Sequence, residues 1–181
     1  MTFKKIADRY HVSSVALHWL MLLLFVVVYA SINLRELFEK GTPTCEGLKN
    51  LHFMCGMLMF ALVWLRLAMR VIHPAPQIQP APAAWQEKLA KLGHLVLYVF
   101  MVGMPLLGWL LLSAAGKPIP FFGLELPALI GPDKALAGQL KEVHEVIGTT
   151  GYFLIGGHAA AALFHHYVQR DNTLLRMRLS S

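Results

Sequence analysis

The chain has 181 residues, of which 56% are hydrophobic and only 14% are charged, and its mean hydropathy is +0.54. So little charge cannot cover the surface of a small soluble globule, and the composition therefore indicates that a lipid bilayer surrounds much of the protein. The formal net charge of +6 comes from basic residues scattered between apolar runs, whereas a nucleic-acid-binding protein would gather them into one stripe. We therefore expect a membrane protein with no nucleic-acid partner.

Four apolar runs follow one another along the chain and predict helices over residues about 12–33, 48–72, 88–115 and 140–168. Each run supplies the ~20 apolar residues that a helix needs to cross the hydrocarbon core. The first run is too long for the apolar part of a cleaved signal peptide, so we keep it as a mature helix. We expect an all-α fold, a transmembrane four-helix up-down bundle that forms a single domain over residues 1–181.

Lysine and arginine are unequally shared between the two sides of such a bundle. Ten of them lie on the side that holds both termini and the proline-rich connector 73–84, and six lie on the other side. The positive-inside rule places the side with more basic residues in the cytoplasm. Both termini are therefore predicted to be cytoplasmic.

Several histidines fall inside the predicted spans, where an ionisable side chain is costly and usually faces the bundle interior to serve a function. One face of the fourth helix carries residues that recur every seven positions: His144, Gly151, His158 and His165. About 21 Å of helix separates His144 from His158, so the two cannot bind the same ion. Each of them therefore needs a partner at its own depth from another helix.

Depth along the helices pairs these two histidines with two others. His52 lies just inside the outer end of the second helix, as His144 does in the fourth. His18 of the first helix lies at a depth comparable with that of His158, on the inner side. His94 of the third helix is expected to be shallower, and it replaces His18 as the inner ligand if that helix is displaced along the membrane normal.

Two layers with two imidazoles each favour two haem groups with bis-histidine axial ligation. Mononuclear zinc or copper sites generally recruit additional Cys, Asp or Glu ligands, and none lies in the spans beside these pairs. The chain has no C-x-x-C-H motif, so the haem is expected to be non-covalent haem b. With both axial positions filled, such iron transfers single electrons instead of binding oxygen.

Four segments carry a resemblance that spans nearly the whole chain: LHW at 17–19, LGHLVLY at 92–98, GYFLIGGHAAAALFHHY at 151–167 and DNTLLRM at 171–177. They are similar to the prokaryotic cytochrome b561 family of four-helix, di-haem proteins of the bacterial inner membrane. The family pattern pairs the first-helix histidine with the inner one of the fourth helix, and the second-helix histidine with the outer one. This resemblance implies the haem ligand pairs His18 with His158 and His52 with His144.

The resemblance also implies electron transfer between membrane ubiquinone and a one-electron donor at the periplasmic face, which for a close relative in the family is superoxide. It assigns quinone contact to His165 and Trp19. An imidazole that titrates near neutrality is suited to exchange a proton with a quinone oxygen. The family has a serine two residues before the first ligand, and Ala16 occupies that position here.

Two other functions are compatible with the same residues. A cytochrome b subunit that passes electrons between the quinone pool and a separate periplasmic dehydrogenase or reductase would share every ligand. A histidine-based ion transporter would hold no haem and would purify colourless. Cys45 and Cys55 both lie toward the oxidising side, where either a disulfide or two free thiols is compatible with the sequence.

Overall fold

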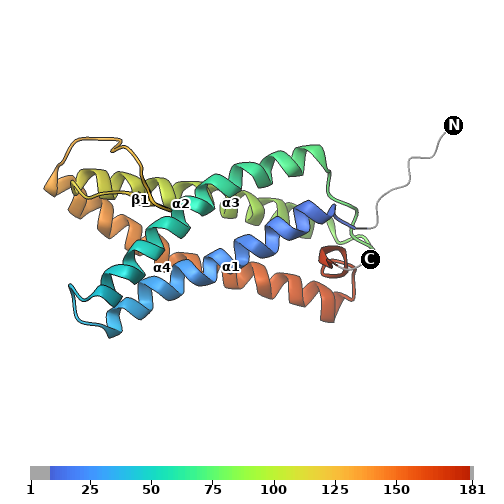
Figure 1. Ribbon diagram of the computed structural model, residues 1–181. Helices are drawn as coiled ribbons and strands as arrows, with labels where there is room; N and C mark the ends of the chain where they lie inside the picture. The colour runs from blue at the N-terminus through green and yellow to red at the C-terminus, as the bar shows by residue number, and fades with distance from the viewer. Residues whose placement is uncertain (1–8, 180–181) are drawn as a thin grey trace.

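The computed structural model describes residues 9–179, which form an antiparallel bundle of four long helices (Figure 1). The helices are α1 (Val12–Leu34), α2 (Pro43–Ile72), α3 (Ala84–Ala114) and α4 (Lys134–Phe164). All four are long and apolar enough to cross a membrane. The predicted all-α transmembrane four-helix bundle is confirmed.

Three helices begin before the apolar runs that revealed them, at residues 43, 84 and 134 instead of about 48, 88 and 140. For α2 and α4, polar residues that cap the first turn explain the difference. The Thr42 hydroxyl accepts a hydrogen bond from the Cys45 backbone N–H at 3.4 Å, and Pro43 follows it as the first helical residue. Asp133 accepts the N–H groups of two residues in the first turn of α4. A hydropathy pattern identifies the apolar part of a helix, and it does not identify polar first turns such as these.

The connectors contain little regular structure. The 3-10 turn η1 (Arg35–Leu37) follows α1, and the strands β1 (Pro120–Phe121) and β2 (Leu124–Glu125) form a small antiparallel hairpin between α3 and α4. After α4 the chain continues through the π-helical turn η2 (His165–Gln169) to the 3-10 turn η3 (Leu175–Met177). Cys45 and Cys55 are buried free thiols.

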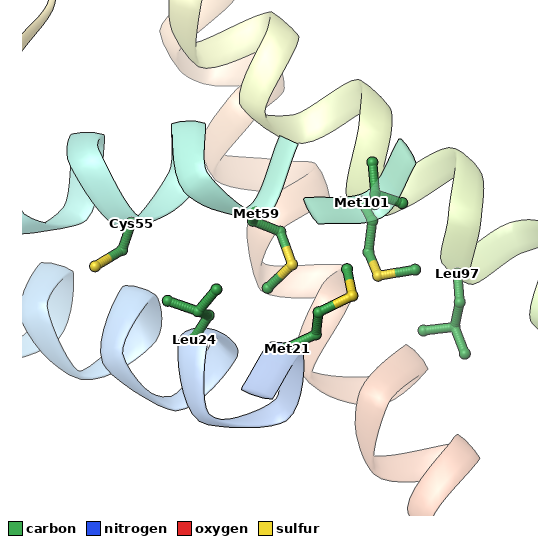
Figure 2. Close-up of a cluster of buried hydrophobic side chains, with 7 residues drawn as sticks. Met21, Leu24, Cys55, Met59, Leu97 and Met101 are labelled. Atoms are coloured by element: carbon green, nitrogen blue, oxygen red, sulfur yellow. The ribbon is translucent and has the colours of Figure 1, made fainter. Parts of the chain in front are cut away.

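The hydrophobic core lies between α1, α2 and α3, where side chains from the three helices point toward one another (Figure 2). Methionine is prominent in this cluster, and its flexible thioether fills irregular gaps between helices. The buried members are Met21, Leu24, Cys55, Met59, Val63, Leu97 and Met101.

Helix α4 is packed differently from the other three. It lies along α3, while within residues 9–179 it makes no comparable backbone packing with α1 or α2. Gly151 is its one buried residue between positions 134 and 164. The bundle therefore leaves α4 at a distance from α1 and α2 that only long side chains cross.

Candidate functional site

The inner layer of the bundle brings together histidines from three helices: His18 of α1, His94 of α3 and His158 of α4. The ring centroids of His18 and His158 lie 6.3 Å apart, with an angle of 72° between the ring planes. The ring centroids of His94 and His158 are 5.5 Å apart. His94, which we expected at a shallower depth, thus contacts the same layer.

The outer layer consists of His52 of α2 and His144 of α4. Their ring centroids are separated by 6.2 Å and their ring planes by 73°, nearly the geometry of the inner pair. His52 Nδ1 lies 2.9 Å from the Val28 carbonyl oxygen of α1. Because a carbonyl oxygen only accepts, Nδ1 carries the proton and Nε2 is available to bind a metal.

Gly151 lies midway between the two histidines of α4, seven residues from each. The Tyr29 hydroxyl and the Phe100 ring occupy the space where a Cβ atom at this position would be. Tyr29 also donates a hydrogen bond of 2.7 Å to the Gly148 carbonyl oxygen. The missing side chain at Gly151 therefore lets aromatic residues of α1 and α3 reach α4 between the two layers.

Both residues that the resemblance assigns to quinone contact the segment that follows α4. His165 Nδ1 lies 2.6 Å from Oδ2 of Asp171, and Trp19 Nε1 donates a hydrogen bond of 3.1 Å to the Met177 carbonyl oxygen. Trp19 also lines a cavity of about 400 Å³, which it shares with His166, Tyr167 and residues of the 174–179 segment. His165 is not among the residues that line this cavity.

Comparison with known proteins identifies the family. The model of the family described as prokaryotic cytochrome b561 matches residues 9–179. The chain belongs to the prokaryotic cytochrome b561 family. It is therefore a multi-pass membrane electron carrier that binds b-type haem.

Individual relatives cover almost the whole chain. Cytochrome b561 homolog 1 of Escherichia coli (strain K12) is 39% identical over 170 residues, which are 94% of this chain and 97% of the relative. A Yersinia pestis protein named probable superoxide oxidase CybB is 37% identical, over 93% of this chain and 95% of its own length. Cytochrome b561 homolog 2 of Escherichia coli (strain K12) is 31% identical, over 98% and 95%.

The centroid separations of the two cross-bundle histidine pairs are compatible with two imidazoles that share one iron atom. A bond from a first-row metal to an imidazole nitrogen is about 2.0 Å long, and that nitrogen lies about 1.2 Å from the ring centre. Two imidazoles on opposite sides of one metal atom therefore have their centroids about 6.4 Å apart. The observed separations are 6.3 Å for His18 with His158 and 6.2 Å for His52 with His144. The 5.5 Å between His94 and His158 is shorter than this spacing.

The other donor atoms also fit a porphyrin better than a bare metal ion. Within residues 9–179 no group of three or more His, Cys, Asp or Glu side chains is placed to hold an ion. A haem supplies four nitrogen ligands itself and needs only two from the protein. Nδ1 of His144 is buried with no hydrogen-bond partner among the described residues, so no contact there fixes which ring nitrogen carries the proton.

Arg66 is a further member of the inner layer, and in the sequence it is only one of the ten basic residues on the side of the termini. Its Nη2 lies 3.2 Å from His18 Nδ1, and its Nη1 is buried without a hydrogen-bond partner in the described chain. A guanidinium only donates, so this contact requires an unprotonated Nδ1, whereas a ring that binds iron through Nε2 carries its proton on Nδ1. Binding of iron through Nε2 therefore requires Arg66 to leave His18 for another acceptor.

A pattern in the sequence points to Arg66. The buried face of α2 follows the spacing of three and four residues that one side of a helix requires. His52 begins this series and Arg66 ends it: His52, Cys55, Met59, Val63 and Arg66. A charge that continues a buried stripe is expected to face the interior. Arg70, four residues further on, continues the same spacing but is exposed, whereas Arg66 is half-buried.

Proposed function

We propose that the chain is a di-haem cytochrome of the bacterial inner membrane that transfers electrons from superoxide at the periplasmic face to ubiquinone. The observation that carries this proposal is the pair of cross-bundle histidine contacts at two levels of one membrane bundle. His52 with His144 would hold one haem b and His18 with His158 the other. Both chain termini are then cytoplasmic, as the distribution of lysine and arginine predicts.

Haem b with two histidine ligands exchanges single electrons and offers no open position to oxygen. The protein's contribution is to place one such group near each membrane surface and to fill the space between them. Tyr29, Phe100 and the methionine-rich cluster lie in this intervening region and exclude water from it. The arrangement suits the passage of electrons across the bilayer between a donor on one side and an acceptor on the other.

The outer face must admit an anion if superoxide is the donor. Two of its lysines are already paired with glutamates: Lys49 with Glu46 at 2.8 Å, and Lys141 with Glu145 at 2.9 Å. Arg35 offers positive charge near the outer layer, since it interacts electrostatically with His52. Its buried Nε has no hydrogen-bond partner within residues 9–179. The positive charge of Arg35 would attract superoxide locally, even though the outer surface as a whole is not positively charged.

The purified protein should contain two haem groups per chain and should reduce a soluble ubiquinone analogue when superoxide is its only electron source. The assay follows haem reduction and quinol formation together, with and without superoxide dismutase. Reduction that requires an added periplasmic dehydrogenase would instead identify an electron-transferring subunit. A colourless preparation would contradict the proposal and leave the ion-transporter hypothesis.

Replacing Arg66 with glutamine should lower the midpoint potential of one haem by about 60 mV, which is about tenfold in the equilibrium constant. A buried cation stabilises the more negative, reduced form of the group beside it, and a carboxylate of a bound haem would be a suitable acceptor for Arg66 once it leaves His18. Potentiometric titration of the purified protein measures the change. Lys88→Gln, which removes an exposed charge at the start of α3, is the control; equal potentials in both variants would exclude Arg66 as a haem contact.

A further inference from the structure

The segment Asp171–Met177 follows the last membrane helix, and it forms hydrogen bonds with both side chains that are assigned to quinone, His165 and Trp19. We propose that Asp171 is a positioning residue for quinone reduction, whose carboxylate orients the His165 ring so that Nε2 faces the quinone oxygen. This inference rests on the proposed function, and it extends the site to a residue that does not itself contact the quinone.

The contact between the two side chains is short and buried. Asp171 is 4% exposed, and its Oδ2 lies 2.6 Å from His165 Nδ1. Its other carboxylate oxygen accepts the Thr173 backbone N–H at 2.9 Å, and its own N–H donates to the His165 carbonyl oxygen at 3.2 Å. Both residues are therefore fixed to each other through side chain and backbone.

The local backbone brings the pair together. In a continuing α-helix, residue 171 would lie about 120° around the axis from residue 165. Instead, the chain forms the π-helical turn η2 and reverses at Arg170, whose φ is 55°. π-helical turns are uncommon and often mark functional sites. Here the turn places the Asp171 carboxylate beside Nδ1 of the His165 ring.

The rest of the segment is held against the bundle by other residues. Asn172 exchanges two hydrogen bonds with Gln79 of the proline-rich connector, at 2.9 and 3.0 Å. The buried Arg176 donates to the Pro76 carbonyl oxygen and lies over the Tyr10 ring, so its charge is not directed at Asp171. Asn172 and Arg176 thus tie the segment to the connector independently of the contact between Asp171 and His165.

The chemistry follows from the donor and acceptor roles. Burial acts to raise the pKa of Asp171, but hydrogen bonds from Thr173 and His165 outweigh it and hold this pKa below its ordinary value. The charged carboxylate only accepts, so Nδ1 of His165 carries a proton and Nε2 is the nitrogen that exchanges one. Asp171 thereby selects both the tautomer and the direction of the ring.

The proton and electron balance is that of quinol formation. The quinone takes up two electrons, one at a time, from the one-electron donor through the protein, together with two protons. At the oxygen facing His165, the Nε2–H bond of the imidazolium breaks as the quinone O–H bond forms. Water on the cytoplasmic side then reprotonates the neutral ring, and water supplies the second proton to the opposite quinone oxygen.

The test isolates the quinone step from the donor. The intact protein is reduced with stoichiometric dithionite and mixed with a ubiquinone analogue, and the loss of the reduced haem band is followed in a stopped-flow instrument. Asp171→Asn should slow the limiting rate by about tenfold to a hundredfold, while the half-saturating quinone concentration changes less than about twofold. Asp171→Glu, which keeps the charge, should recover part of the rate.

Three comparisons make the result decisive. Asn172→Ala loosens the same segment without touching the His165 contact, so its rate should equal that of the wild type; an equally slow rate would show a structural effect and overturn the proposal. Asp171→Asn combined with His165→Gln should be no slower than His165→Gln alone. A wild-type rate in Asp171→Asn would also overturn the role of Asp171, whereas a wild-type protein that quinone does not oxidise would overturn the proposed function itself.

Discussion

His52→Ala is expected to abolish binding of the outer haem and to halve the haem content of the purified protein. Within residues 9–179 the histidines of the outer layer are His52 and His144 alone, so loss of either imidazole would leave iron with one protein ligand. The Val28 carbonyl oxygen that orients His52 is not a substitute, because it serves as a hydrogen-bond acceptor on the helix backbone. Haem quantification and reduced-minus-oxidised spectra measure the loss.

The inner layer should respond differently to its two substitutions. His158→Ala removes the ring that both neighbours contact, so the inner haem should be lost completely. His18→Ala leaves His94 beside His158, and we expect partial retention with a shifted spectrum. Replacing both His18 and His94 should then abolish binding of this haem.

The control for these substitutions is His73→Ala. The His73 ring stacks on that of His11 with centroids 4.0 Å apart, and neither residue belongs to a histidine layer. This variant should keep the full haem content and the wild-type spectrum. Retention of both haems after His52→Ala or after His158→Ala would contradict the ligand assignment.

The four spans and the partners of the histidines were predictable because both depend on position along a helix. A run of apolar residues reports the part of a helix inside lipid, and helical rise converts residue number into depth. His52 and His144 therefore fall at one depth before any contact is known, and the structure brings their rings together. The first turns of α2, α3 and α4 precede the apolar runs, so hydropathy did not predict them.

The contacts of Arg66 and Asp171 depend on geometry that residue number does not contain. Arg66 contributes to a count of positive charges wherever its side chain points, and only its place on the buried face of α2 gives it an interior role. Asp171 meets His165 because a π-helical turn and a left-handed residue intervene. A standard helical period would place the two on different faces.

Gly151→Leu should prevent the bundle from closing and should cause loss of both haem groups. A Cβ atom at this position would collide with the Tyr29 hydroxyl and the Phe100 ring. Neither ring can move freely, because Tyr29 is hydrogen-bonded to Gly148 and Phe100 stacks on Phe25. A leucine would therefore push α4 away from α1 and α3 at the level between the two histidine layers.

The smaller substitution Gly151→Ala distinguishes the steric clash from the change in helix propensity that replacing any glycine causes. Alanine favours a helix by about 1 kcal/mol relative to glycine, whereas overpacking a well-filled site costs about 1–3 kcal/mol. Gly151→Ala should therefore lower the thermal midpoint in detergent despite the gain in helix propensity. Gly156→Ala and Gly157→Ala, where an added Cβ meets nothing within 4 Å, should leave that midpoint unchanged or raise it. Equal midpoints for Gly151→Ala and these two variants would show that Tyr29 and Phe100 adapt, and the spacing between α4 and its neighbours would then not depend on Gly151.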